Sequence, residues 1–386
     1  MRIAFYAPLK PPSHPVPSGD RRMARLLIQA WEKAGHRIEV ASRLRTHEGK
    51  ADAARQADLA AIGAVHANRL LRDYAKRPPN ERPSAWFTYH VYYKAPDWIG
   101  PRVAKAMNIP YLIAEASLAN KRARGPYELG HLATLEAIRA AKVIFSINPT
   151  DAEALQGVVS EGTQLVDLPA FVDTAPYRRM AEQHDSLRRD IAYRHKLETG
   201  HLWLLTVAMM RSGDKLASYK LLGEALEQVL DLYWQLIVVG DGNAREEVHR
   251  ALAPLGEDRV RFVGAQSESA LPSFYGAADL CVWPAVNEAY GMALLEAQAT
   301  GLPVVAGGSG GVPSIVESGI TGLLSEPGDQ AAFARALRNL IDTPKRRAAM
   351  ARAAFEKTRK LHDIAAAAQL LDRALHQALL VALPGA

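Results

Sequence analysis

The sequence predicts an α/β protein made of two doubly wound, Rossmann-like domains that face each other across a cleft. Short apolar runs alternate with helical patterns along all 386 residues. Nearly continuous apolar strands indicate parallel sheets that helices cover on both faces. The alternation starts afresh after a polar, charged stretch at 175–200, and a chain of this length is sufficient for two domains.

Six strands are expected in each half of the chain. They fall at residues 2–8, 37–42, 84–90, 110–116, 143–148 and 164–169, and then at 202–208, 234–240, 260–264, 280–285, 303–307 and 322–326. In the first half, helices are expected near 20–34, 53–75, 98–107, 127–141 and 150–157.

The polar stretch sets the expected domain boundary. We interpret residues 175–200 as the end of the first domain and the linker, so the domains are expected at 1–195 and 196–364. A long Ala-rich helical run follows at about 347–382, and its last part, about 365–386, is expected to return to the first domain.

Composition narrows the class of protein. Apolar residues make up 48% and charged residues 23%, as in an ordinary globular protein. Cys281 is the single cysteine, which excludes an intrachain disulfide and suits a reducing cytoplasm. No apolar run reaches the ~20 residues of a membrane span, and the N-terminus reads as a strand rather than a signal peptide.

Charge is unevenly placed. Residues 1–200 carry 30 Lys and Arg against 21 Asp and Glu, whereas residues 201–386 carry 17 against 20. A basic half indicates an anionic partner, although basic residues are also common on solvated surfaces. No nucleic-acid reader motif accompanies the charge, so we expect no nucleic-acid partner. Peripheral contact with an anionic membrane stays open.

The stretch from Asn287 to Pro313 places two carboxylates around an expected helix start. Tyr290-Gly291-Met292 opens this helix, so its first backbone N–H groups form an anion site suited to a phosphate. Glu288 precedes the helix, and Glu296 lies about one and a half turns inside it. Both can accept hydrogen bonds from hydroxyls, and a ribose presents such a pair to Glu296.

A glycine-rich loop at 307–313 follows the next expected strand. We expect its backbone to pass close to a ligand. The loop lacks the G-x-G-x-x-G spacing of a dinucleotide site. No His/Cys cluster has the spacing of metal ligands, so no metal site is expected.

The motif EAYGMALLE, Glu288 to Glu296, resembles the E-x-[FY]-G-x-x-x-x-E hallmark of the family 4 retaining glycosyltransferases of the GT-B fold. Dense similarity covers about 95 residues, and looser similarity lies in the first half. These segments are residues 236–242, 260–285 and 299–329, then 15–42 and 169–173.

The resemblance implies a retaining hexosyl transfer from a nucleotide diphosphate sugar, bound mostly by the second domain, to an acceptor bound by the first. A saccharide or lipid-linked acceptor in cell-envelope polysaccharide or glycolipid synthesis is expected, without a metal or other cofactor. The leaving phosphate oxygen would take the acceptor proton, or a carboxylate would act as nucleophile. The implied donor-binding residues are Gly19, Arg211, Lys215, Glu288, Tyr290, Gly291, Met292 and Glu296.

Arg211, Lys215 and Glu288 are also implied catalytic residues, although the spacing of Arg211 and Lys215 is one residue shorter than in the family's pattern. Asp20, beside Gly19, can instead cap its helix. Many family members place a histidine after the fourth strand, where this chain has Glu115. Glu115 and His90 therefore remain alternatives for the group nearest the reacting carbon.

Other interpretations stay open. Lys121, Arg122 and Arg124 form either a basic face for an anionic acceptor or a solvated loop. A non-catalytic nucleotide-sugar-binding protein and a GT-B sugar-nucleotide epimerase are the alternative functions. The expected location is the cytoplasm, with or without peripheral contact at the inner face of the membrane.

Overall fold

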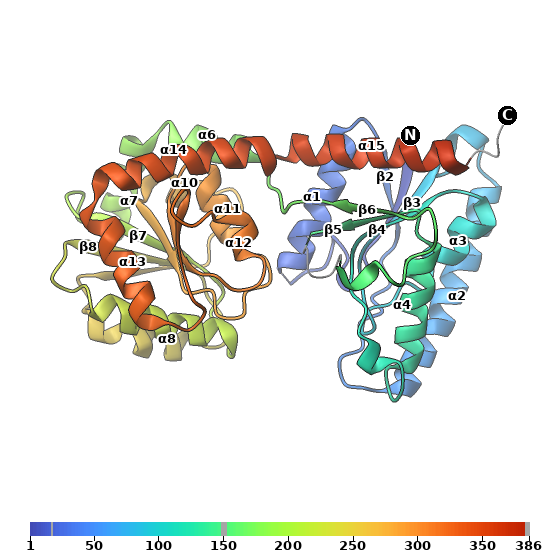
Figure 1. Ribbon diagram of the computed structural model, residues 1–386, viewed down its shortest axis with the longest axis horizontal. Coiled ribbons are helices and arrows are strands. Elements are labelled where there is room, and N and C mark those ends of the chain that lie inside the picture. The colour runs from blue at the N-terminus through green and yellow to red at the C-terminus, as the bar shows by residue number, and fades with distance from the viewer. Residues whose placement is uncertain (17, 148–152, 383–386) are drawn as a thin grey trace. The chain divides into compact units, whose positions relative to one another are not determined.

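The computed structural model describes residues 1–16, 18–147 and 153–382, which form two compact units (Figure 1). Unit 1 runs to Pro169 and also includes the described residues from Ile364 onward. Unit 2 comprises Ala170–Asp363. None of the helices described in these ranges is long and apolar enough to cross a membrane.

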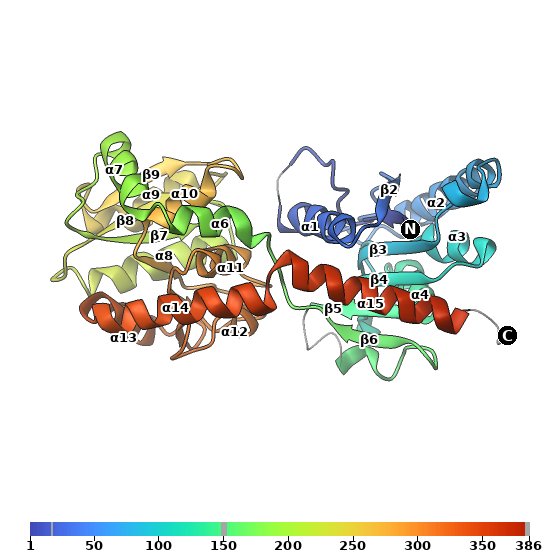
Figure 2. The same cartoon turned by 90° about the horizontal axis from the view of Figure 1, so that it is seen from above.

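Unit 1 has a six-stranded parallel sheet of order β2-β1-β3-β4-β5-β6. Its strands are β1 (Arg2–Tyr6), β2 (Arg37–Ser42), β3 (Ala85–Val91), β4 (Tyr111–Ala116), β5 (Val143–Ser146) and β6 (Gln164–Asp167). Its helices are α1 (Gly19–Lys33), α2 (Ala53–Ala75), α3 (Gly100–Met107), α4 (Glu128–Ala140) and α15 (Ile364–Ala382), with 3₁₀ turns η1 (Pro79–Glu81) and η2 (Asn120–Arg122). Helices α1 and α15 pack together, and α2, α3 and α4 form a second group (Figures 1 and 2).

Unit 2 repeats this plan with the order β12-β11-β10-β7-β8-β9, also parallel throughout. Its strands are β7 (Leu202–Val207), β8 (Trp234–Val239), β9 (Val260–Gly264), β10 (Leu280–Trp283), β11 (Val304–Gly307) and β12 (Gly322–Ser325). Its helices are α6 (Thr174–Ala181), α7 (His184–His195), α8 (Asp214–Glu227), α9 (Arg245–Leu252), α10 (Leu271–Ala277), α11 (Met292–Ala299), α12 (Val312–Ile315), α13 (Gln330–Asp342) and α14 (Pro344–Leu361), with the 3₁₀ turn η3 (Ala253–Leu255).

The predicted α/β class with two parallel sheets is confirmed, and all twelve predicted strands occur to within two residues at either end. Every residue of β4 and of β8 is buried, as expected for strands with helices on both faces. The helix predicted near 150–157 begins outside the described residues.

The sequence analysis interprets the polar stretch at 175–200 as the end of the first domain and the linker, and this is wrong. The stretch folds into α6 and α7, which pack on α10 of unit 2. The division therefore falls at 169/170 rather than at 195/196. Buried and paired side chains anchor the stretch. Tyr177 is buried, and the guanidinium of Arg188 lies 4.1 Å from the centre of the Trp203 ring and donates to Asp279 at 2.8 Å. Charged residues with apolar stems can cover a core in this way.

The final helical run is divided into α14 and α15 at His362-Asp363. Asp363 accepts hydrogen bonds from the backbone and hydroxyl of Thr174, which joins the helix break to the start of α6. Helix α15 then packs on α1, where Leu371 and Leu375 are fully buried.

The docking of α15 predicts a difference between two leucines of this helix. Leu375 is 0% exposed and Leu380 is 72% exposed. We expect Leu375→Ala to lower the free energy of unfolding by about 2–5 kcal/mol, because it removes buried methyl groups and leaves a cavity. The matched control Leu380→Ala should change it by less than about 0.5 kcal/mol. Equal losses in chemical denaturation would contradict the docking.

Candidate functional site

The carboxyl ends of β7 and β10 lie side by side at the point where the second sheet changes direction. From β7 the chain proceeds to β8 on one side, and from β10 it proceeds to β11 on the other. Loops at such a switch point diverge and leave room for a ligand. The loop after β7 leads to Arg211 and Lys215, and the loop after β10 carries Glu288.

An ion pair and an indole join these two loops. Lys215, in the first turn of α8, donates from Nζ to Glu288 Oε2, and Trp283 Nε1 donates to the same oxygen at 3.2 Å. The Lys215 Nζ lies 5.3 Å from the centre of the Trp283 ring. Tyr219 packs edge-on against that ring at 5.0 Å. Because the pair is half-buried, solvent screens it less than a surface pair.

The loop carrying Glu288 has an unusual backbone. Ala285 and Asn287 have positive φ values of 55° and 48°, which non-glycine residues rarely adopt. Asn287 Nδ2 donates to Asp214 Oδ2 at 3.0 Å, and Val286 N donates to Ser218 Oγ at 3.0 Å. Such conformations persist where the surroundings over-determine them, and they are frequent at functional sites.

The glycine loop at 307–313 packs against this same backbone. A Cβ on Gly310, whose φ is +53°, would lie 2.0 Å from the carbonyl oxygen of Glu288. A Cβ on Gly311 would lie 2.6 Å from the Ala289 oxygen, to which the Gly311 N–H donates at 2.8 Å. These glycines therefore allow two loops of the protein to touch, whereas the sequence analysis assigned the loop to close approach of a ligand.

Helix α11 begins at Met292, later than the predicted start at Tyr290. Gly291 is its N-cap, with φ 75° and ψ 43° in the left-handed region. Within the described ranges, no side chain makes a capping hydrogen bond to this helix end. The positive end of the helix dipole and its first amides therefore lie only four residues after Glu288 in the chain.

Arg211 and Glu296 lie in different surroundings. Arg211 is exposed, in a loop where Met210 N donates to Asp241 O at 3.0 Å. Glu296 lies inside α11 and is only 2% exposed. Burial, and then the nearby Glu296 carboxylate, raise the pKa of Cys281 on β10. The structure thus joins Lys215 and Glu288, while the ribose contact of Glu296 stays a prediction.

The predicted residues of unit 1 also gather at the carboxyl edge of their sheet. His90 Nδ1 lies 3.2 Å from Asp20 Oδ1 and 3.7 Å from Glu115 Oε1. His90 and Glu115 both have a φ of 63°. The two alternatives of the sequence analysis are thus neighbours in one cluster. Gly19 begins α1, and a Cβ there would meet nothing within 4 Å, so packing does not require glycine.

Asp20 belongs to this cluster and does not cap its helix. Ser18 is the N-cap of α1, and its side chain accepts from Arg21 N at 3.2 Å. Burial acts to raise the pKa of Asp20, but the hydrogen bond and charge of His90, with Lys10, hold it below the ordinary value.

Trp283 and Asp20 are site residues for which the sequence analysis predicts no role in ligand binding or catalysis. Trp283 lies inside the apolar strand predicted at 280–285, and only its observed position at the carboxyl end of β10 could have indicated its contact with Glu288. Asp20 reads as a helix-start residue, and no sequence signal joins it to His90.

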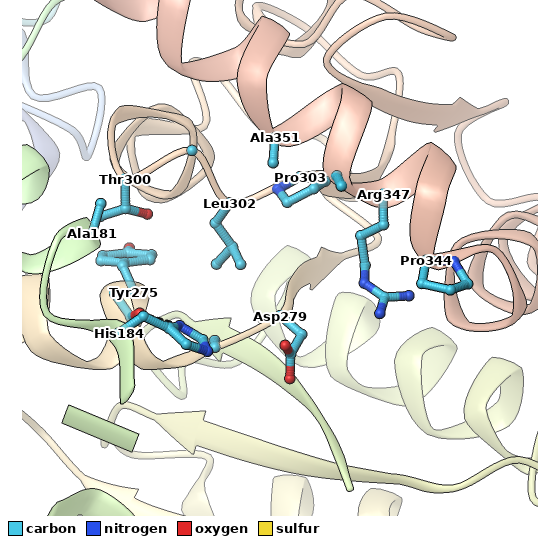
Figure 3. A pocket seen from close by; sticks show the side chains of 14 residues that line it. Ala181, His184, Tyr275, Asp279, Thr300, Leu302, Pro303, Pro344, Arg347 and Ala351 are labelled. Atoms are coloured by element: carbon cyan, nitrogen blue, oxygen red, sulfur yellow. Dashed lines mark hydrogen bonds between the residues drawn. The ribbon is translucent and has the colours of Figure 1, made fainter. Parts of the chain in front are cut away.

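A cavity of about 310 Å³ in unit 2 lies away from these clusters (Figure 3). Asp279 and Pro303, which line it, immediately precede β10 and β11, so the cavity is at the amino edge of the sheet. Arg347 extends into it from α14 (Figure 3). Glu288 follows β10 at the opposite edge, and the cavity is therefore not part of its site.

The sequence of this chain is similar to those of known glycosyltransferases. The family model "Glycosyl transferases group 1" matches residues 205–357. D-inositol 3-phosphate glycosyltransferase of Corynebacterium efficiens is 42% identical over 130 residues, 33% of this chain and 31% of that protein. The protein of the same name from Salinispora tropica is 42% identical over 115 residues, 30% of this chain and 24% of that protein. The chain thus matches less than a third of the length of each relative.

Solved structures match over nearly the whole chain. Sucrose-phosphate synthase of Thermosynechococcus elongatus gives a TM-score of 0.73 at 21% identity, covering 99% of this chain and 100% of that one. HepE of Anabaena in complex with UDP gives 0.72 at 16% identity, covering 98% and 100%. The chain has the GT-B fold, and the group 1 glycosyltransferase model matches a segment that lies within its second unit.

The packing of the glycine loop predicts a steric effect of one methyl group. Gly310→Ala and Gly319→Ala both place alanine at positive φ, but only at Gly310 would the Cβ meet backbone. We expect Gly319→Ala to destabilise by about 1 kcal/mol, and Gly310→Ala to destabilise more and to displace Glu288. Chemical denaturation and the indole NMR signal of Trp283 measure the two effects. Equal behaviour of the variants would contradict the close contact.

The Asp20–His90 contact predicts a titration. Carboxyl-carbon NMR should give Asp20 a pKa below 3.8, and His90→Gln should raise it. Because the folded-state pKa is lowered, Asp20 stabilises unit 1 above its unfolded pKa, and this contribution is lost as pH falls through the folded pKa. His376→Gln, at an exposed position of α15, should leave the Asp20 pKa unchanged. An unchanged pKa in His90→Gln would refute the contact.

Proposed function

We propose that the protein is a glycosyltransferase that moves a hexosyl group from a nucleotide diphosphate sugar to an acceptor with retention at the anomeric carbon. The observation that carries the proposal is the Lys215–Glu288 pair, beside the start of α11, at the switch point of a group 1 glycosyltransferase domain. Switch points bind nucleotides in open α/β sheets, and a helix start attracts phosphate.

The pair suggests how the donor is held. In the structure, Lys215 forms an ion pair with Glu288. A bound diphosphate would take Lys215 as its counter-ion, because it carries more charge than one carboxylate. Glu288 would then be released to accept a hydrogen bond from a hydroxyl of the donor sugar. One exchange would thus prepare both the phosphate contact and the sugar contact.

The same groups suit the chemical step. Negative charge grows on the diphosphate as the sugar–oxygen bond breaks, and charges already in place stabilise it without reorganisation. Arg211, Lys215 and the amides of Tyr290, Gly291 and Met292 are the proposed stabilising groups. The nucleotide sugar is the co-substrate, and the proposal assigns no metal or other cofactor.

The remaining roles follow the same proposal. The buried Glu296 would accept two hydrogen bonds from the ribose hydroxyls, which compensate a carboxylate removed from water. His90 and Glu115 are proposed on the acceptor side, and Gly19 leaves open space for a ligand group. The leaving phosphate oxygen takes the acceptor proton, and a carboxylate nucleophile is the alternative.

Names of similar proteins guide the choice of substrates. HepE was solved with UDP and with UDP-glucose, and this supports a nucleotide donor. The curated relatives are glycosyltransferases named for an inositol phosphate, matched only in part. We propose a saccharide or lipid-linked acceptor of the cell envelope, and a cytoplasmic enzyme with peripheral contact at the inner face of the membrane.

Calorimetric titration with UDP, GDP and ADP tests the donor site. We expect one nucleotide to bind the wild type and Glu296→Ala to lose about 2–4 kcal/mol, roughly thirtyfold or more in affinity. The matched control Glu326→Ala, an exposed carboxylate of the same unit, should bind normally. No binding to the wild type, or equal binding to Glu296→Ala, would overturn the donor site.

Turnover separates the transferase from its rivals. A non-catalytic binding protein would bind the nucleotide sugar without releasing nucleotide. An epimerase would invert a carbon centre of the sugar, and the sugar would stay attached to the nucleotide. The transferase should release nucleotide when acceptor is present, more slowly in Glu288→Gln and Lys215→Gln. NMR of the product's anomeric proton reports whether configuration is retained.

A further inference from the structure

Basic side chains follow four neighbouring strands of unit 1 at the same edge of the sheet. Lys10 follows β1, Arg45 and His47 follow β2, Lys94 follows β3, and Arg122 follows β4 in η2. The strands are adjacent in the order β2-β1-β3-β4, so their carboxyl-end loops converge. None of these residues lies within 205–357, the segment that the family model covers.

Two tyrosines form the centre of this edge. Tyr93 and Tyr127 pack edge to face, with their ring centres 5.0 Å apart. The Lys94 Nζ lies 5.8 Å and 5.9 Å from the two ring centres, and the Arg122 guanidinium carbon lies 5.6 Å and 5.5 Å from them. A cation beside an aromatic face keeps its charge for a ligand, because the ring provides no anionic partner.

Arg122 has unused hydrogen-bonding capacity. Its Nε is buried, and among the residues that the structure describes it has no hydrogen-bond partner. Buried donors are normally paired, and an unpaired one marks a group whose partner is a water, an ion or a ligand. The planar fork of a guanidinium matches the oxygens of a phosphate.

Other cations reinforce the positive potential of this edge. Arg45 Nη2 lies 3.3 Å from His47 Nδ1. Burial, and then the charges of Arg45 and Lys94, lower the pKa of His47. The charges of Glu48 and Asp20 act in the opposite direction, with smaller effects than those of the two cations. Glu48 also accepts hydrogen bonds from the backbone of Lys50 and Asp52.

From this geometry we propose that the edge binds a phosphate group of the acceptor, with Arg122 and Lys94 as its main ligands and Tyr93 as the surface against which the acceptor packs. The proposal rests on the proposed transferase function and specifies the chemistry of its acceptor. The phosphate can belong to a sugar phosphate in solution or to a lipid headgroup, and the test separates these sources.

The test measures calorimetric binding of inorganic phosphate and of glucose 6-phosphate to the full chain. The titrations are made with the donor site filled by the nucleotide that binds there, or in Lys215→Gln if none binds. We expect binding to the wild-type edge, and a loss of roughly tenfold in Arg122→Gln and again in Lys94→Gln. The matched control Arg124→Gln, an exposed residue of the same loop, should bind as the wild type does.

Co-sedimentation with vesicles distinguishes the two sources. Vesicles of phosphatidylcholine that contain about 30 mol% phosphatidylglycerol are compared with vesicles of pure phosphatidylcholine. Binding to the anionic vesicles that Arg122→Gln abolishes would assign the phosphate to a lipid. Binding of glucose 6-phosphate without vesicle binding would assign it to a sugar phosphate.

The possible failures are distinguishable. If neither phosphate probe nor anionic vesicles bind, or if Arg122→Gln and Lys94→Gln bind as tightly as the wild type while unfolding at its temperature, the phosphate site is wrong and the donor site is unaffected. If the edge binds phosphate but no nucleotide binds unit 2, the site stands and the transferase function fails.

Discussion

The arrangement of the second unit depends on close contact between the backbones of its carboxyl-end loops. A Cβ on Gly240, whose φ is +151°, would lie 1.9 Å from the Ala208 oxygen, and a Cβ on Gly307 would lie 2.0 Å from the Pro284 oxygen. The loop after β8 thereby supports the loop after β7, and the loop after β11 supports the loop after β10. The first pair of loops contains Arg211, which follows β7. The second pair contains Glu288, which follows β10. Glycine is needed here for contacts within the protein.

Electrostatics explain why the cluster of Lys215, Glu288 and Trp283 is stable. A half-buried lysine or glutamate without a partner would lose hydration without compensation. Lys215 and Glu288 compensate each other, and Trp283 orients the shared carboxylate oxygen. The positive φ values of Ala285 and Asn287 show that the local backbone is held in a less favourable conformation to present that carboxylate. Unit 1 repeats the pattern, since His90 and Glu115 share a φ of 63° and a mutual contact.

Sequence reasoning succeeded where the signal is local. Runs such as WQLIVVG identify buried strands by composition, and the spacing of Glu288 and Glu296 identifies the helix start between them. It failed where the decisive contact is distant in the chain. The stretch at 175–200 is polar on average, but Tyr177 and Arg188 pack it against the rest of unit 2 through partners many residues away. Likewise, Asp20 and His90 are 70 positions apart, so neither residue reveals the other.

The packing of α15 on α1 has a consequence for synthesis on the ribosome. Unit 2 is one continuous segment, whereas unit 1 is closed by residues that follow unit 2 in the chain. The part of unit 1 that is made first therefore stays incomplete while the whole of unit 2 is translated. During this time, the apolar surface that receives Leu371 and Leu375 is exposed. At about 5–20 residues per second this interval lasts on the order of tens of seconds. The order of translation thus gives unit 2 the first opportunity to fold completely, and leaves unit 1 as the part of the nascent chain that most needs protection.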